Sequence, residues 1–188
     1  MLPTGQARES IEGIDVTCID VAMPLMIARA QDFGVTGYET REALDADADL
    51  LARMERIRLE AGRRMGLGDV SRSVTPKVAL LAPPRAAGAA VTARYFMPWQ
   101  CHPSMAVTGG QCIAACLYQP GSVAEGIAAP PADNPAFVRI EHPSGELAVT
   151  LDYALEGNRL AVRAAGLLRT ARLLARGEVM IPGGVWPG

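Results

Sequence analysis

Apolar and polar residues alternate over several short stretches of the chain. Residues 14–29 read IDVTCIDVAMPLMIAR, with apolar residues alternating and then running together on either side of Met23 and Pro24. This pattern predicts two β-strands of one sheet, joined or bent at the proline. Residues 75–84 (TPKVALLAPP) and 88–99 (GAAVTARYFMPW) are apolar runs bounded by proline and glycine, so they predict two further strands.

A helical period occurs at residues 45–67. The spacing of its apolar positions predicts an outer amphipathic helix with one buried face. These positions are Leu50, Leu51, Met54, Ile57, Ala61 and Met65. Asp45 or Asp47 is a candidate N-cap, and the acidic start and arginine-rich end of the segment suit the helix dipole.

The residues after Thr108, Gly109 and Gly110 form an apolar run, roughly positions 110–118, with no charged residue. A helix that is apolar all round must be enclosed by other parts of the protein. We therefore expect a curved sheet to wrap this helix.

The last third of the chain predicts a hairpin and one ambiguous segment. Residues 137–155 alternate around a Pro-Ser-Gly turn. Farther along, residues 162–168 suit a strand, whereas residues 170–176 also fit a short helix that ends at Gly177. Together the elements predict an α+β fold, a single domain over residues 1–188 with an antiparallel sheet curled around a central apolar helix.

Composition narrows the classes of function. The chain has 188 residues, 49% of them apolar and 5% aromatic, which suits one core of aliphatic side chains. The net charge is -2 and Lys77 is the single lysine, so we expect no nucleic-acid binding. The four cysteines form no CxxC pair, which argues against a metal site. Without a signal peptide or an apolar run of about 18 residues, we expect a cytoplasmic protein with reduced thiols and no membrane association.

The helix start at residues 108–110 is the strongest candidate for a binding site. Free backbone N–H groups and the positive end of a helix dipole attract a carboxylate or phosphate. Such an anion would lie beside Ser104 and Thr108, with Arg94 as a bidentate carboxylate clamp and His102 as a proton donor or acceptor. Alternatively, Thr108 is only the N-cap, and the two glycines permit close packing under the helix.

Three other side chains have a chemical and a structural interpretation. Cys101 and His102 could form a nucleophile pair, although neighbours in sequence usually point apart. Lys77 lies in a strand-like run, where a partly buried lysine serves as a base or an anion contact; an ordinary surface lysine is the alternative. Met23 is most simply a core residue.

Several segments resemble the PrpF family, and within it the 4-oxalomesaconate tautomerases of aromatic-acid degradation. They occur in the family's order and cover nearly the whole chain. The segments are LPTG at Leu2, IDVTCIDVAMPLMI at Ile14, FGVTGYE at Phe33, ERIRLEAGRRMGLGDV at Glu55, TPKVALLAPP at Thr75, RYFMPWQCHPSMAVTGGQCIAACLYQPGS at Arg94, and the closing EHPSG and GLLRTARLLARGEVMIP. Taken together they are specific, although no single segment is.

The resemblance implies a domain of the diaminopimelate-epimerase type, in which two such domains face each other across a cleft. Family members move a proton along an allylic system of a polycarboxylate, without metal or organic cofactor. The resemblance therefore implies an isomerase domain for a di- or tricarboxylate such as 4-oxalomesaconate. Arg94, His102, Ser104 and the helix start at Thr108 would contact this substrate, and Met23 would shape the cleft wall. A methylaconitate-type cis-trans isomerase is the alternative within the family.

Two departures from the family pattern limit this expectation. Met105, Ala106 and Val107 occupy the positions where epimerase relatives carry a catalytic cysteine. The resemblance also covers only the family's C-terminal half, and Lys77 does not match the lysine base of the N-terminal domain. We therefore expect the N-terminal domain to be absent and the catalytic base to remain unassigned. The expected partner is an N-terminal-domain chain or a second copy of this chain; a carboxylate-binding half-domain without turnover is the alternative class.

Overall fold

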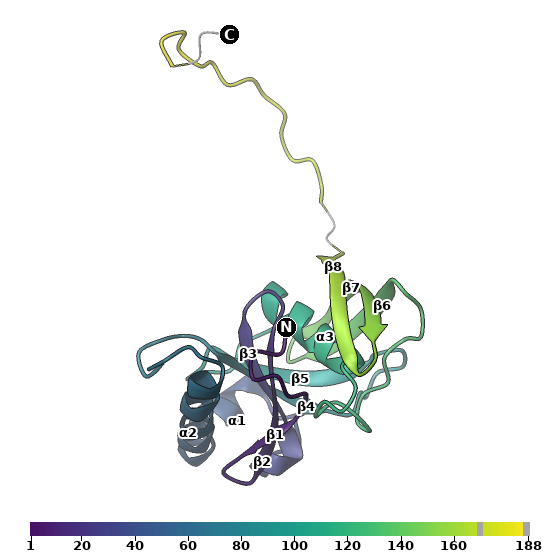
Figure 1. Ribbon diagram of the computed structural model, residues 1–188. Coiled ribbons are helices and arrows are strands. Elements are labelled where there is room, and N and C mark those ends of the chain that lie inside the picture. Colours follow the sequence, from purple (N-terminus) through teal and green to yellow (C-terminus); the bar gives the residue numbers. More distant parts are fainter. Residues whose placement is uncertain (169–170, 186–188) are drawn as a thin grey trace.

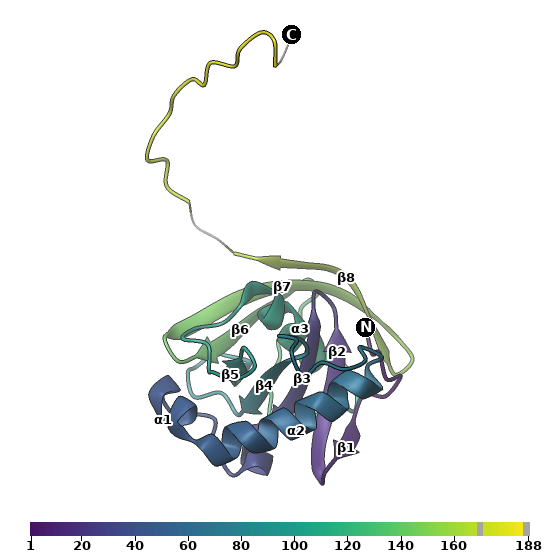
Figure 2. The same ribbon diagram turned by 90° about the vertical axis from the view of Figure 1, so that its left-hand side faces the viewer.

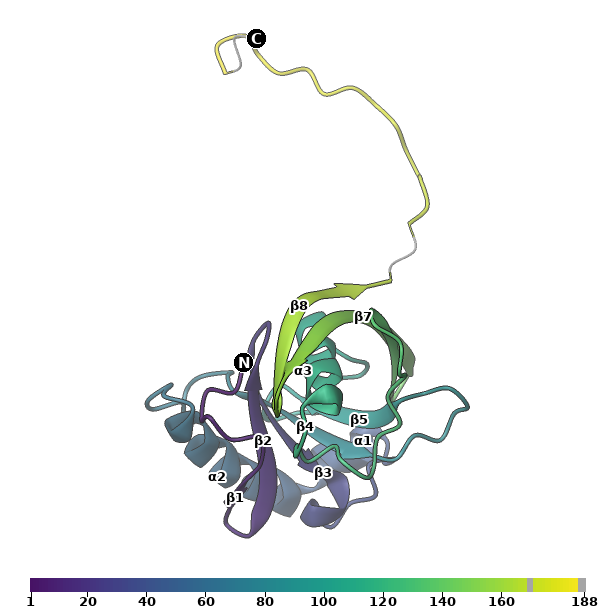
Figure 3. The same ribbon diagram turned by 45° about the vertical axis from the view of Figure 1, so that its right-hand side comes forward.

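The computed structural model describes residues 1–168 and 171–185. Its strands form one sheet whose spatial order follows the chain order. The strands are β1 (Glu9–Ile11), β2 (Ile14–Asp20), β3 (Pro24–Arg29), β4 (Lys77–Ala82), β5 (Val91–Phe96), β6 (Ala136–His142), β7 (Gly145–Glu156) and β8 (Arg159–Leu167). The helices are the 3-10 helix η1 (Ala30–Phe33), α1 (Arg41–Ala46), α2 (Ala48–Arg64) and α3 (Val107–Tyr118). The sheet curls around α3 (Figure 1, Figure 3), which confirms the predicted α+β fold.

Neighbouring strands are antiparallel except at two places in the sheet. β3 is parallel to β4, and β5 is parallel to β6. Along the chain, one or more helices separate the two members of each parallel pair, because the chain must cross back before it can add a parallel neighbour. The prediction of an antiparallel sheet is therefore corrected at these two pairs. The two strands predicted for residues 14–29 are present as the antiparallel pair β2–β3, and the hairpin predicted for residues 137–155 is present as β6–β7.

The two faces of the sheet carry separate hydrophobic layers. One layer surrounds α3, and the other lies under α2, which crosses the opposite face (Figure 2). Successive residues of a strand point to opposite faces. In β5, Ala93 and Tyr95 therefore join the layer of α3, whereas Phe96 joins the layer of α2. This alternation decides which residues of β5 can reach the start of α3.

The outer amphipathic helix begins later than predicted and follows a separate short helix. Asp47 ends α1 and is the N-cap of α2, and its side chain accepts a hydrogen bond from Leu50 N at 2.9 Å. The structure thus selects Asp47 of the two candidate caps. Asp45 lies inside α1, because the backbone of Asp47 leaves the helical conformation at φ -86 and ψ 87 and divides the predicted segment.

The segment after β8 leaves the sheet and extends away from it (Figure 1, Figure 2). The strand predicted for residues 162–168 is confirmed, because β8 ends at Leu167. The helix predicted for residues 170–176 is wrong over 171–176, which are not helical, and Thr170 lies outside the described residues. So short a helix, unpacked against anything, cannot offset its nucleation cost. In the described part of the chain, no helix is long and apolar enough to cross a membrane.

Arg58 anchors the loop between α2 and β4. Its side chain is fully buried, pairs with Glu55 at 2.7 Å, and donates to the carbonyl oxygens of Val70, Ser73 and Thr75. A buried guanidinium is tolerated only when its charge and its donors are satisfied in this way. Arg58 therefore fixes where the chain enters β4.

We expect Arg58→Met to lower the free energy of unfolding by about 3 kcal/mol, because the carbonyls of Ser73 and Thr75 and the carboxylate of Glu55 lose this buried donor. The matched control is Arg63→Met on the same helix, which breaks a pair of equal length, 2.7 Å to Glu60, at a side chain that is 70% exposed. Urea denaturation should place the control close to the wild type. Equal losses in both variants would contradict the anchoring role of Arg58.

Candidate functional site

Elements from distant parts of the sequence meet at one end of the sheet. β3 and β4 run parallel, with Leu25 opposite Lys77, and β5 runs back with Phe96 opposite Val78. The turn before β3, the first residue of β4 and the segment after β5 consequently lie at the same end. That segment leads directly into α3, so the topology brings Met23, Lys77, residues 102–104 and the helix start to one region.

Met23 joins the β2–β3 turn to the start of α3. Its sulfur accepts hydrogen bonds from the hydroxyls of Tyr95 and Thr108, each at 3.1 Å. The Cys112 thiol donates to the Met23 carbonyl oxygen at 3.3 Å. Met23 is therefore more than apolar filling, since three contacts fix the turn against the helix.

The first turn of α3 leaves backbone donors available. The helix begins at Val107, three residues before the apolar run 110–118, and its N-cap Ala106 supplies no side-chain hydrogen bond. Among the described residues, no acceptor is recorded for the N–H groups of Val107, Thr108 and Gly109, whereas Gly110 N donates to Ala106 O. The interpretation of Thr108 as the N-cap is wrong, because this residue lies inside the helix. The free N–H groups and the helix dipole together suit an anion.

Gly109 and Gly110 permit close packing, as the alternative interpretation held. A Cβ atom on Gly109 would lie 2.3 Å from the Tyr95 ring, and one on Gly110 would lie 2.5 Å from a methyl carbon of Leu147. Both approaches are closer than carbon atoms tolerate. Close packing of Gly109 against Tyr95 leaves the Gly109 N–H free to donate a hydrogen bond. The two glycines can therefore permit close packing and also form part of an anion site.

Gly109→Ala should lower the free energy of unfolding by about 1–3 kcal/mol, because the new methyl meets a rigid, buried ring. Gly110→Ala is the matched control. Its methyl meets the end of a flexible, part-exposed leucine, and the helix propensity of alanine returns roughly 1 kcal/mol. Thermal or urea denaturation should show a clear loss only for the first variant. A larger loss in Gly110→Ala would contradict this account.

His102 and Ser104 form a small polar unit beside the helix start. Nδ1 of His102 accepts from Ser104 N at 3.0 Å, and the His102 ring meets the edge of Tyr95 at a centroid distance of 6.0 Å. Burial lowers the pKa of His102, and the positive charges of Arg41 and Lys77 lower it further. The imidazole is consequently neutral near pH 7, with its proton on Nε2 as a hydrogen-bond donor.

An NMR titration of His102 should give a pKa below the ordinary value of about 6.5. Protonation is disfavoured in the folded state, so the stability that this residue contributes is present above the unfolded pKa and is lost as the pH falls through the folded pKa. Lys77→Met should raise the pKa of His102, because it removes one of the two nearby positive charges. A value at or above 6.5 in the wild type would contradict the description of a neutral ring.

Lys77 is part-buried at the beginning of β4. Burial lowers the pKa of its ammonium group, and the charge of Arg58 lowers it further. Cys101 is different in kind. Burial raises the pKa of its thiol to about 11, and the sulfur donates to the His102 carbonyl oxygen at 3.6 Å rather than meeting the ring. A Cys101–His102 nucleophile pair is therefore not formed.

Arg94 does not share this region with the helix start. Tyr95 packs under Gly109, so the preceding residue of the strand points to the opposite face of the sheet. There Arg94 donates from Nε to Glu39 O at 2.9 Å. The structure thus brings together Met23, Lys77, His102, Ser104 and the start of α3, and places Arg94 on the face of the sheet opposite to α3.

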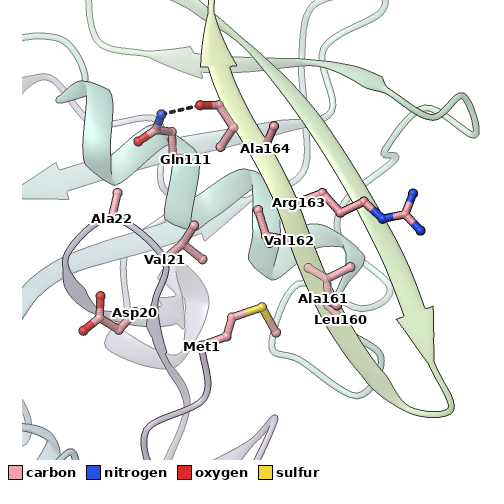
Figure 4. A pocket seen from close by; sticks show the side chains of 11 residues that line it. Met1, Asp20, Val21, Ala22, Gln111, Leu160, Ala161, Val162, Arg163 and Ala164 are labelled. Atoms are coloured by element: carbon pink, nitrogen blue, oxygen red, sulfur yellow. Dashed lines mark hydrogen bonds between the residues drawn. The ribbon is translucent and has the colours of Figure 1, made fainter.

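A pocket beside the helix start was missed from the sequence. It has a volume of about 430 Å³ and lies between the β2–β3 turn, residues 20–22, and the outer edge of β8, residues 160–165 (Figure 4). Gln111, one helical turn after Thr108, lines it and donates to Ala165 O at 3.0 Å. Gln111 is the lone polar side chain in the apolar run 110–117, and this was the one sequence signal for the pocket.

Comparisons with known proteins agree with this architecture. The crystal structure of a methylitaconate-delta-isomerase has the same fold, with a TM-score of 0.75 and 23% identity, over 96% of this chain and 54% of the other. The likeness defines the class of fold, a sheet curled around one helix. The sequence matches the PrpF protein family over residues 1–182. The chain belongs to this family.

Curated relatives carry more specific names. The chain is 47% identical to the 4-oxalomesaconate tautomerase of Pseudomonas putida, over 100% of this chain and 51% of that protein. It is 43% identical to the (4E)-oxalomesaconate Delta-isomerase of Novosphingobium sp., over 96% and 50%. It is 32% identical to the 2-methyl-aconitate isomerase of Shewanella oneidensis, over 97% and 51%. The chain spans about half the length of the curated relatives it matches.

Proposed function

We propose that this chain is the carboxylate-binding half of a cofactor-independent isomerase, which moves a proton along an allylic system of a polycarboxylate such as 4-oxalomesaconate. The observation that carries the proposal is the start of α3. Its free N–H groups lie at the same end of the sheet as the neutral His102 and the single lysine, Lys77. The names of the relatives at 43% and 47% identity support the choice of substrate.

The site suits charge that develops during such a reaction. When a base removes a proton from carbon, negative charge spreads through the conjugated double bonds onto a carboxylate. The N–H groups of Thr108 and Gly109 would stabilise this charge, and Nε2–H of His102 would donate to a neighbouring oxygen. Lys77 would hold a second carboxylate.

The base itself is assigned to a partner rather than to this chain. Cys101 is buried and its thiol has a raised pKa, so it is not a ready proton acceptor. The relatives are about twice as long as this chain, which suits a partner domain that supplies the base. This chain and a partner that carries the base must be present in the same compartment. We propose that this compartment is the cytoplasm.

The extended segment after β8 is the proposed contact with that partner. Its large apolar side chains are 58–87% exposed, and none of them is covered in the structure. These residues are Leu173, Leu174, Val179, Met180, Ile181 and Val185. Exposed apolar residues at this density mark an interaction surface rather than a free terminus. The partner is a family N-terminal domain, with a second copy of this chain as the alternative.

A methylaconitate-type isomerisation is the second candidate function. It rests on the 32% identity to a 2-methyl-aconitate isomerase, and it uses the same type of proton transfer. The same site would also serve a half-domain that binds a carboxylate without turnover. One set of proteins distinguishes the two isomerase activities from carboxylate binding without turnover.

The test is an ultraviolet assay of 4-oxalomesaconate tautomerisation. We expect no turnover from the chain alone and turnover when a family N-terminal domain is supplied in trans. In the mixture, Lys77→Met should raise KM, whereas Arg159→Gln, an exposed substitution on β8, should behave as the wild type. Methylaconitate is assayed in parallel to separate the two substrates. Turnover by the chain alone would place the base in this chain and contradict the proposal. No turnover of either substrate in the mixture would favour a half-domain that only binds a carboxylate.

A further inference from the structure

Arg94 lies in an environment unlike that of the other buried arginine. The side chain is 7% exposed, and it donates to two backbone carbonyl oxygens, from Nε to Glu39 at 2.9 Å and from Nη1 to Ala93 at 3.2 Å. No ion pair of Arg94 is recorded among residues 1–168 and 171–185. Arg58, by contrast, is paired with Glu55. A buried guanidinium without a counter-charge is costly, so its persistence requires an explanation.

The two nearest carboxylates are already occupied by other donors. Glu39 accepts from the backbone N–H groups of Thr36 and Gly37 and from the Thr36 hydroxyl. Burial disfavours the ionised form of Glu39, but these hydrogen bonds outweigh it and lower its pKa. Both carboxylate oxygens therefore accept hydrogen bonds within their own turn, and the charge of Glu39 acts on Arg94 without a direct ion pair.

Glu141 is held in the same way on the neighbouring strand. It accepts from the backbone N–H groups of Arg85 and Ala86 and from the Thr92 hydroxyl. The remaining charged neighbours do not neutralise Arg94 either. Arg41 is also positive and pairs with Asp45 at 3.2 Å, and Asp45 in addition accepts from Cys101 N.

The free side of Arg94 faces a pocket. Within the described residues, Nη2 has no recorded hydrogen-bond partner, and the side chain lines a pocket of about 370 Å³. Residues 38–42, Pro103 and the β6–β7 turn form the rest of its wall. This wall includes Arg41 and the hydroxyls of Thr40 and Ser144, and also the acidic residues Glu39 and Glu42. This pocket lies on the face of the sheet opposite to α3, and Pro103 in its wall places it next to His102 and Ser104 of the site proposed for isomerisation.

We propose that this pocket binds the carboxylate group of a small organic acid, with Arg94 as its principal ligand. The planar guanidinium presents parallel N–H groups that match the two oxygens of a carboxylate. Hydroxyls of Thr40 and Ser144 and the cation of Arg41 lie around the same space. The anion contact that the sequence suggested for Arg94 is thereby kept, but it belongs to a second site.

The test follows Arg94 itself in the wild-type chain, uniformly labelled with 13C and 15N, by NMR of the arginine Nε–H groups and of the backbone amides. Malonate is added at constant ionic strength, held with sodium chloride. We expect the Arg94 signal to shift saturably, while the Arg58 signal in the same sample stays in place because its donors are satisfied. Backbone-linked assignment identifies both signals without a variant. Arg94→Lys, which keeps the charge but loses the planar fork, should weaken malonate binding at least tenfold.

Several outcomes would overturn the proposal. Shifts confined to the backbone amides of Thr108 and Gly109 would place the anion only at the start of α3. No saturable shift would remove the site, and a stronger response to inorganic phosphate than to malonate would contradict the assignment to carboxylates. Because the measurement involves no turnover, its result is independent of the isomerase activity.

Discussion

The closeness of α3 to β5 is the constraint on which the rest of the fold depends. The helix is apolar on all sides and must lose contact with water over its whole circumference. It can do so only if the sheet curls around it, and the curl is tight enough that residue 109 has no room for a side chain beyond hydrogen, against Tyr95. The same approach aligns Tyr95 and Thr108 on the sulfur of Met23. Packing and the geometry of the candidate site thus have one cause.

Local patterns were sufficient for most of the elements. Alternation gave the hairpins, the absence of polar faces gave the enclosed helix, and a helical period gave α2. Errors arose where the hydrophobic pattern does not carry the deciding information. The parallel pairs depend on where each helix returns the chain, and the division at Asp47 depends on a single residue's φ and ψ. The segment 171–176 has good helical spacing, but no surface in the structure packs against it.

The candidate site shows the same division between local and distant information. The helix start and the neighbouring histidine were visible because they lie within a few residues of each other. The position of Arg94 was not predicted. It could have been inferred from the alternation of side chains along the strand, because the adjacent residues Arg94 and Tyr95 of β5 cannot both face α3. The resemblance to a family placed these residues in one motif, and a motif does not state which face of a strand each residue occupies. Composition alone does not predict a functional arginine either. Arg58 and Arg94 are both buried, but only Arg58 has a direct ion pair.

The spatial order of the strands has a consequence for how the chain reaches this structure. Every strand pairs with the strand that precedes or follows it in sequence, so no pairing waits for a remote part of the chain. The entropy lost on closing a loop grows with its length, and here the two longest closures are those that enclose α1 with α2 and α3. Sheet growth can therefore proceed from one neighbour to the next, which keeps the contact order low for a protein rich in β-structure. A sheet curled around a helix is in this sense assembled in the order in which it is synthesised.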